Sequence, residues 1–292
     1  MNRFDTQWRV LDTGLHSAAE NIAMSRAILE AHQQGLVPHT LRFLQFTPSA
    51  LLGYHQSVEQ ELDADYCLTH GIEIQRRITG GGAVYFDSTQ IGWELYLDKT
   101  FFGTAKMAKI TRRICEAAAQ GLHDLGVDAW FRPRNDIEVN GRKISETGTA
   151  FGVECYSVPT LNSSERAIYQ RALCEIEHPN WVFQYNRSLN ETETLSGLWR
   201  CDGGLMRVEM VVDKVKGRLK QCLITGDFFI NPKRFILDLE AALRDTLISD
   251  LNNNIHNFFV DQNADTLLIG AEDFIQLFEH ALQSQPEEVL LA

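Results

Sequence analysis

The chain has 292 residues, of which 44% are hydrophobic and 23% charged, as expected for an ordinary soluble globular protein. Its formal net charge of −12 argues against nonspecific binding to nucleic acid or to an anionic membrane surface, because both need a basic face. The sequence contains neither a signal-peptide core nor a run of about 18 apolar residues, so we expect a cytoplasmic protein without a membrane span. Its six cysteines are scattered without zinc-site spacing, which favours free thiols.

In the first half, apolar patterning predicts several short strands separated by helices. A capping box at Ser17 and Glu20 predicts a helix that ends near Gly35. The predicted strands are 8–11, 41–46, 50–53, 72–78, 83–86 and 93–97, with further helices over 63–70 and from residue 104. Because only a turn containing Pro48 separates 41–46 from 50–53, we expect these two strands to share a sheet.

In the second half, Asn140-Gly141 predicts a type I′ hairpin between short strands within 129–147. The further predicted elements are a helix over 164–174, strands over 205–212 and 219–225, and helices over 232–247 and 272–284. We place a domain boundary in the polar segment between them, which gives a first domain of residues 1–177 and a second of 178–292. The expected class is α+β.

The most informative segment is 76–87, which reads RRITGGGAVYFD. Three successive glycines let backbone N–H groups approach an anion closely, and Arg77 is a matching cation for phosphate or carboxylate. A glycine triplet alone is also typical of a flexible turn. The flanking arginines and apolar strands favour the anion loop.

A second segment, 134–145, reads RNDIEVNGRKIS and places Lys143 at the start of the return strand of the predicted hairpin. On its own, such a lysine would be a solvated surface residue. Together with the glycine loop and Arg77, it predicts a site for two negatively charged groups. Leu41, Phe43, Ile78, Val84 and Trp93 lie on the neighbouring strands, and they either line a channel for an aliphatic chain or belong to the core.

These motifs resemble the lipoate–protein ligases of the biotinyl/lipoyl ligase superfamily. LLGYHQ at 51–56 is similar to the family's Gly-x-x-Gln strand end, and the three motifs occur in the family's order within 8–149. Residues 204–229, ending in LITGDFF, resemble the accessory domain of bipartite ligases, especially those associated with sulfur-oxidation lipoate-binding proteins. The resemblance implies mixed sheets with packed helices and a small α+β accessory domain.

The resemblance also implies a reaction. A ligase of this family activates lipoate or octanoate with ATP and Mg²⁺ to an acyl-AMP, then transfers the acyl group to a lysine of an acceptor domain. Lys143 would lie between the carboxylate and the α-phosphate, and Asp136 would hold magnesium, orient Lys143 or cap the hairpin. The implied ATP- and lipoyl-AMP-binding residues are Arg77, Thr79, Gly80, Gly81, Gly82, Ala83, Val84, Tyr85, Asn135 and Asp136.

The chain departs from the family pattern in three places. Phe86 stands where histidine is common, Glu146 follows Ser145 where glycine is common, and the segment after Thr149 looks too short to complete the catalytic domain. Two other functions therefore stay open beside the ligase. One is an octanoyl or lipoyl transferase that forms a thioester on Cys155 and needs no ATP, although Cys155 also fits a small buried residue. The other is a degenerate homologue that binds an acyl group, a nucleotide or an acceptor domain without turnover.

Overall fold

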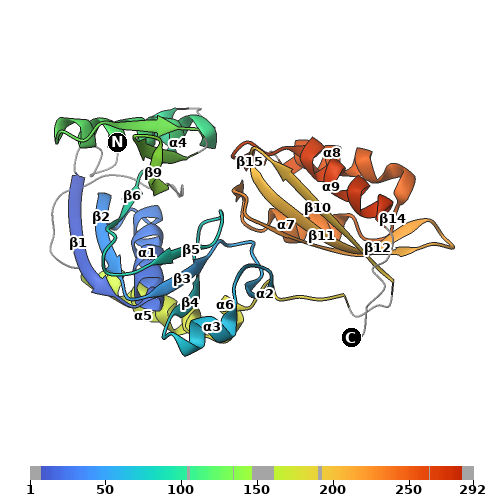
Figure 1. Ribbon diagram of the computed structural model, residues 1–292, viewed down its shortest axis with the longest axis horizontal. Helices are drawn as coiled ribbons and strands as arrows, with labels where there is room; N and C mark the ends of the chain where they lie inside the picture. Colours follow the sequence, from blue (N-terminus) through green and yellow to red (C-terminus); the bar gives the residue numbers. More distant parts are fainter. Residues whose placement is uncertain are drawn as a thin grey trace.

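The computed structural model describes residues 8–103, 106–133, 135–146, 161–189, 193–262 and 264–284. Figure 1 shows an N-terminal part built from several small sheets and helices, followed by a C-terminal part in which helices cover one twisted sheet. This mixed arrangement confirms the predicted α+β class. Within the described ranges, no helix combines the length and apolar composition that crossing a bilayer requires.

The first sheet has the order β1-β2-β6, and the long helix α1 packs against it. Its elements are β1 (Trp8–His16), α1 (Ala18–Gln33), β2 (His39–Phe46) and β6 (Gly92–Tyr96). The predicted capping box is confirmed: the Ser17 side chain accepts from the backbone of Glu20, whose carboxylate accepts from the backbone of Ser17. This cap sets where α1 begins, and the face of α1 toward the sheet is almost entirely buried.

The second sheet has the order β4-β3-β5 and carries the glycine loop between two of its strands. Its elements are β3 (Ser49–Leu52), α2 (Val58–Glu61), α3 (Ala64–Thr69), β4 (Glu73–Arg76) and β5 (Val84–Phe86). The expectation that 41–46 and 50–53 share a sheet is wrong, because β2 pairs with β1 and β6 whereas β3 pairs with β4 and β5. Pro48 has no N–H for a ladder, and its carbonyl accepts from Glu73 at 2.9 Å, so the chain enters a new sheet.

The third sheet, β7-β8-β9, packs one face on helix α4. Its elements are η1 (Lys99–Phe102), α4 (Met107–Asp124), β7 (Ala129–Arg132), β8 (Asp136–Val139) and β9 (Arg142–Glu146). Ile137 is buried against Cys115 and Ala119 of α4. The type I′ turn is confirmed by positive φ at both Asn140 (50°) and Gly141 (74°). This rigid hairpin fixes the direction of Lys143.

Helices α5 (Ser163–Ile176) and α6 (Pro179–Val182) cover the N-terminal part from the other side. Helix α5 packs along α1, and the Arg9 guanidinium is bonded to the Glu165 carboxylate in a fully buried pair. Val182 of α6 is buried with Leu52 and Val58. The described part of the second predicted domain therefore begins with residues that contact the first, and the boundary at 177/178 stays a prediction.

The C-terminal part is a sheet of order β10-β11-β12-β14 with helices packed on it. Its elements are β10 (Thr194–Cys201), β11 (Gly204–Asp213), β12 (Arg218–Gly226), β13 (Ile230–Asn231), α7 (Phe235–Ala242), β14 (Thr246–Leu247), η2 (Ile248–Asp250), α8 (Leu251–Gln262), β15 (Asp265–Thr266) and α9 (Ala271–Gln283). One core containing Phe228, Phe235 and Phe274 holds them together. The predicted helix over 232–247 is shorter because Asp245 has φ of 61° and donates its N–H to Leu219.

His55 is buried where the two parts meet. Its ring stacks on Phe228, with centroids 5.1 Å apart, and Nδ1 lies 3.2 Å from the Tyr185 hydroxyl. Burial, together with the charge of Arg76, lowers the pKa of His55 from 6.5 to about 3. The folded protein therefore holds this imidazole neutral, while the unfolded chain protonates it below about pH 6.5.

We expect the free energy of unfolding to fall as the pH falls below about 6.5. Below that pH, His55 binds a proton in the unfolded state but not in the folded state. His55→Phe keeps the ring stack and removes the titrating group. Between about pH 6.5 and pH 5, the variant should therefore lose about 2 kcal/mol less of its free energy of unfolding than the wild type. Urea unfolding of wild type and variant across this pH range measures the difference. Burial also lowers the pKa of His39 to about 3, so His39 accounts for the acid sensitivity that remains in the variant. An unchanged pH slope in His55→Phe would contradict it.

Candidate functional site

The glycine loop is held by close packing against two other segments. A Cβ on Gly53 would overlap the carbonyl oxygen of Gly81, and a Cβ on Gly80 would overlap the carbonyl oxygen of Phe228. Gly81 has φ of 93°, a conformation that favours glycine, and its Cβ position meets the Phe229 ring at 2.7 Å. Gly80 and Gly81 of the triplet are therefore required by packing between the end of β3 and the segment after β12.

Two of the groups predicted to bind an anion, the Gly81 amide and the Arg77 guanidinium, are already bonded within the protein. Gly81 donates its N–H to the carbonyl of Phe228 at 3.2 Å, and the Arg77 guanidinium donates to the carbonyls of Leu51, Gly80 and Gly82 at 2.8–3.0 Å. The carboxylate of Asp227 lies 3.7 Å from the Cβ position of Gly82. In this arrangement the Gly81 amide and Arg77 are occupied and a carboxylate adjoins the loop, which disfavours an anion at these two groups.

The strand end before the loop is also fixed by internal hydrogen bonds. The Gln56 side chain accepts from the N–H of Gly53 at 2.8 Å, so the Gly-x-x-Gln pattern forms a closed turn. Arg76 is fully buried and donates to the carbonyls of Gly53, Tyr54 and Gln56, and to those of α6. Arg76 is thus a structural arginine that binds backbone carbonyls, and its buried guanidinium faces no solvent.

Lys143 lies on β9 with its ammonium 3.1 Å from the Asp136 carboxylate of β8. The register of the hairpin shifts so that Lys143 pairs with Glu138 and Ser145 with Ile137. This bulge places Lys143 on the sheet face opposite to α4, the face that also carries Asp136. Its side chain is 45% exposed, so it is both anchored by Asp136 and accessible. Of the three alternatives for Asp136, the structure shows it oriented toward Lys143.

A cavity of about 520 Å³ lies between the three sheets of the N-terminal part, with Phe229 of the C-terminal part at its wall. Of the predicted site residues, it brings together Arg77, Thr79, Val84, Tyr85 and Lys143. The remaining predicted residues are not part of its lining: Gly80, Gly81, Gly82, Ala83, Asn135 and Asp136. Asn135 is buried, and Asp136 contributes through Lys143.

Most of the cavity wall is apolar. Of the five residues predicted to line a channel or join the core, Ile78, Val84 and Trp93 line it. Leu41 and Phe43 do not, because alternation along β2 puts Leu44 and Phe46 on the cavity side instead. The remaining apolar lining residues include Ile22, Leu51, Phe86, Ile91, Leu95 and Ile114. A wall of this kind, with Lys143 and Arg77 beside it, suits an aliphatic chain with a polar head.

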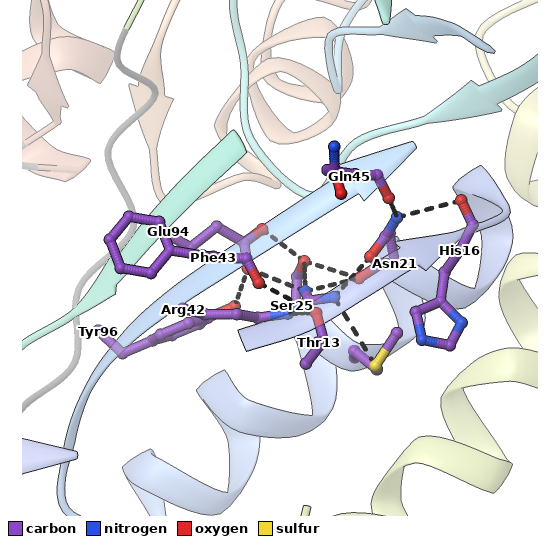
Figure 2. A network of polar contacts seen from close by, with 10 residues as sticks. Thr13, His16, Asn21, Ser25, Arg42, Phe43, Gln45, Glu94 and Tyr96 are labelled. Carbon is purple, nitrogen blue, oxygen red and sulfur yellow. Dashed lines mark hydrogen bonds and ion pairs between the residues drawn. The ribbon is translucent and has the colours of Figure 1, made fainter. Parts of the chain in front are cut away.

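One wall of the cavity is a polar network that the sequence motifs did not predict (Figure 2). The Glu94 carboxylate accepts from Arg42 at 3.0 Å, from Ser25 at 2.6 Å and from Tyr96 at 2.6 Å. Arg42 is fully buried and donates further to Asn21 of α1. The signal in the sequence was a glutamate within the apolar strand WELY, facing an arginine within LRFL.

The described cysteines do not line this cavity. Burial raises the pKa of the thiols of Cys67, Cys201 and Cys222, which disfavours the nucleophilic thiolate. Cys155 lies outside the described residues. Within the described ranges, no group of three or more His, Cys, Asp or Glu side chains is placed to hold a metal ion.

Comparison with known proteins identifies relatives that match about half of this chain. Octanoyltransferase LipM of Halalkalibacterium halodurans is 32% identical over 146 residues, which are 49% of this chain and 53% of that protein. Octanoyltransferase LipM of Kyrpidia tusciae is 34% identical over 155 residues, covering 52% and 54% of the two chains. This chain thus spans about half the length of the curated relatives it matches.

Solved structures share the fold. The lipoate-bound LipL1 of P. falciparum superposes with a TM-score of 0.64 at 13% identity, covering 94% of this chain and 97% of that one. A lipoate-protein ligase A bound with ATP gives a TM-score of 0.51 at 19% identity over 61% of this chain and 99% of that one. A family model described as the lipoyl protein ligase A/B catalytic domain matches residues 17–158. Over these residues, the chain is similar to the catalytic domain of the lipoyl protein ligase A/B family.

Proposed function

We propose that this protein transfers an octanoyl or lipoyl group from a thioester donor to a lysine of an acceptor lipoyl domain, without ATP. The observation that carries this proposal is the cavity, whose apolar wall leads to Lys143 while the neighbouring glycine loop is bonded to Phe228. The octanoyltransferase relatives support the same reaction class. The relation of one structural neighbour to an E2 lipoyl domain supports the acceptor class.

The reaction proceeds in two acyl transfers. The Cys155 thiolate attacks the thioester carbonyl of an octanoyl carrier protein, forming a thioester on the enzyme and expelling the carrier thiolate, which takes up a proton. The neutral amine of the acceptor lysine then attacks this second thioester. An amide forms, the amine loses a proton, and the Cys155 thiolate is regenerated.

Lys143 supplies the electrostatic stabilisation in both transfers. Each attack pushes negative charge onto the carbonyl oxygen, and an ammonium at the cavity wall stabilises that charge more in the transition state than in the ground state. The Asp136 carboxylate at 3.1 Å orients the ammonium. A fixed cation needs no reorganisation when the charge develops.

The ATP-dependent ligase is a second candidate, and the C-terminal part is the observation that favours it. The likeness to LipL1 extends over 94% of this chain and therefore includes this part. For a nucleotide to use the glycine loop, Gly81 and Arg77 must first exchange their bonds to Phe228, Leu51 and the loop carbonyls. The arrangement with the loop closed favours the transferase.

The two candidates differ in the donor they need. We expect an acceptor lipoyl domain to gain the mass of one octanoyl group when mixed with this protein and an octanoyl carrier protein, with no nucleotide present. Cys155→Ala should abolish that gain, and Cys174→Ala, which changes an exposed cysteine away from the cavity, should leave it unchanged. A gain that requires free octanoate, ATP and magnesium, and that persists in Cys155→Ala, would establish the ligase instead. If the acceptor gained no mass with either donor, the remaining function would be that of a degenerate homologue that binds without turnover.

A further inference from the structure

The polar network of Figure 2 places a carboxylate in the wall of a cavity that is otherwise mostly apolar. Glu94 and Arg42 face each other across the antiparallel strands β6 and β2, and Ser25 comes from α1. Glu94, Ser25 and Tyr96 line the cavity, whereas Arg42 lies behind them with no exposed surface. The charge of Glu94 is therefore balanced from the protein side, and its free surface faces the cavity.

Glu94 retains capacity to accept a hydrogen bond. A carboxylate offers about four acceptor positions. Arg42, Ser25 and Tyr96 occupy three of them, and 28% of the Glu94 side chain is exposed. A fourth donor must come from the contents of the cavity. The methyl end of an unsubstituted acyl chain has no hydrogen-bond donor. It would exclude water from the Glu94 carboxylate without replacing the lost hydrogen bond.

Charge fixes the direction in which an acyl group enters. Lys143 lines the cavity from β9 of the third sheet, so its ammonium attracts the carboxyl or thioester oxygen. Glu94 lies on β6 of the first sheet, and its carboxylate offers that oxygen no hydrogen-bond donor. The apolar lining, including Ile78 and Leu44, lies in the same cavity and suits the methylene chain. An acyl group whose carboxyl lies at Lys143 would extend its remote end toward the other walls of the cavity, which include Glu94.

We propose that this cavity selects a medium-chain acyl group that carries a hydroxyl or thiol donor near its remote end, with Glu94 as the specificity-determining acceptor. The inference rests on the proposed function, because it takes the cavity as the acyl site. Arg42 and Ser25 position the carboxylate. An unsubstituted octanoyl group enters the same cavity and binds more weakly, since it leaves the fourth acceptor position of Glu94 unpaired.

Isothermal titration of the full chain with octanoate and ω-hydroxyoctanoate compares two ligands that differ by one hydroxyl. The wild type should bind ω-hydroxyoctanoate about tenfold more tightly, as expected for one hydrogen bond to a charged acceptor. Glu94→Gln should bring the two affinities to within about twofold. Glu30→Gln is the matched control: it removes a glutamate that pairs with Arg26 on the same helix, outside the cavity, and should keep the preference.

Equal or tighter binding of octanoate by the wild type would overturn the inference, and this comparison decides even if Glu94→Gln does not fold. A preference that persists in a folded Glu94→Gln would also overturn it. Octanoyl transfer to an acceptor domain, measured with the same preparation, separates the two proposals. Transfer without a preference refutes only the role of Glu94, whereas absence of both acid binding and transfer refutes the proposed function as well.

Discussion

Lys143→Ala should lower the rate of octanoyl transfer to an acceptor domain by about a hundredfold to a thousandfold. The ammonium of Lys143 lines the cavity and is held 3.1 Å from Asp136, so its removal leaves the developing oxyanion without its cation. Asp136→Asn should lower the rate by roughly tenfold, because Lys143 then loses the carboxylate that orients it. Single-turnover transfer, followed by the mass of the acceptor, measures both effects.

Arg142→Ala is the matched control for Lys143→Ala. It removes one positive charge from the adjacent position of β9, on an exposed side chain that does not line the cavity. We expect transfer to stay within about twofold of wild type. If Arg142→Ala and Lys143→Ala were equally impaired, net charge would explain the loss, and the assigned role of Lys143 would be wrong.

Gly53→Ala should lower the free energy of unfolding by about 3 kcal/mol and sharply reduce transfer. The added Cβ overlaps the carbonyl oxygen of Gly81, which is backbone and cannot rotate away as a side chain would. The glycine loop must then move, and with it the contact to Phe228 that joins the two parts. Urea unfolding and the transfer assay together measure this effect.

Gly121→Ala provides the comparison. Gly121 lies within α4, and its Cβ position meets no atom within 4 Å. Alanine there should stabilise the protein by about 0.5–1 kcal/mol, because glycine costs more conformational entropy in a helix. A Gly53→Ala variant that is as stable as Gly121→Ala would show that the loop is not packed as described.

Local signals predicted much of the fold, because they act over a few residues. The capping box at Ser17 and the Asn140-Gly141 turn each specify their own backbone geometry, and both occur as predicted. Sheet partners depend on residues far apart in the chain. The two strands flanking Pro48 therefore separated into different sheets, and the largely polar helix α8 was not predicted.

The candidate site was predictable to a similar degree. Lys143 and Arg77 were found because their motifs are short and chemically distinctive. The packing role of the glycine triplet was not found, because it depends on Gly53 and Phe228, which are distant in sequence. Glu94 was missed because one charged residue in a short apolar strand is usually a solvated position, and its partner Arg42 lies on another strand.

The central claim is that the chain itself carries the acyl group between donor and acceptor. The most direct measurement is the intact mass of the protein after mixing with an octanoyl carrier protein, without nucleotide and without acceptor. We predict one added octanoyl group on the wild type, none on Cys155→Ala, and its loss when an acceptor domain is added. An unmodified wild-type chain, together with acceptor acylation that requires ATP and magnesium, would contradict the account.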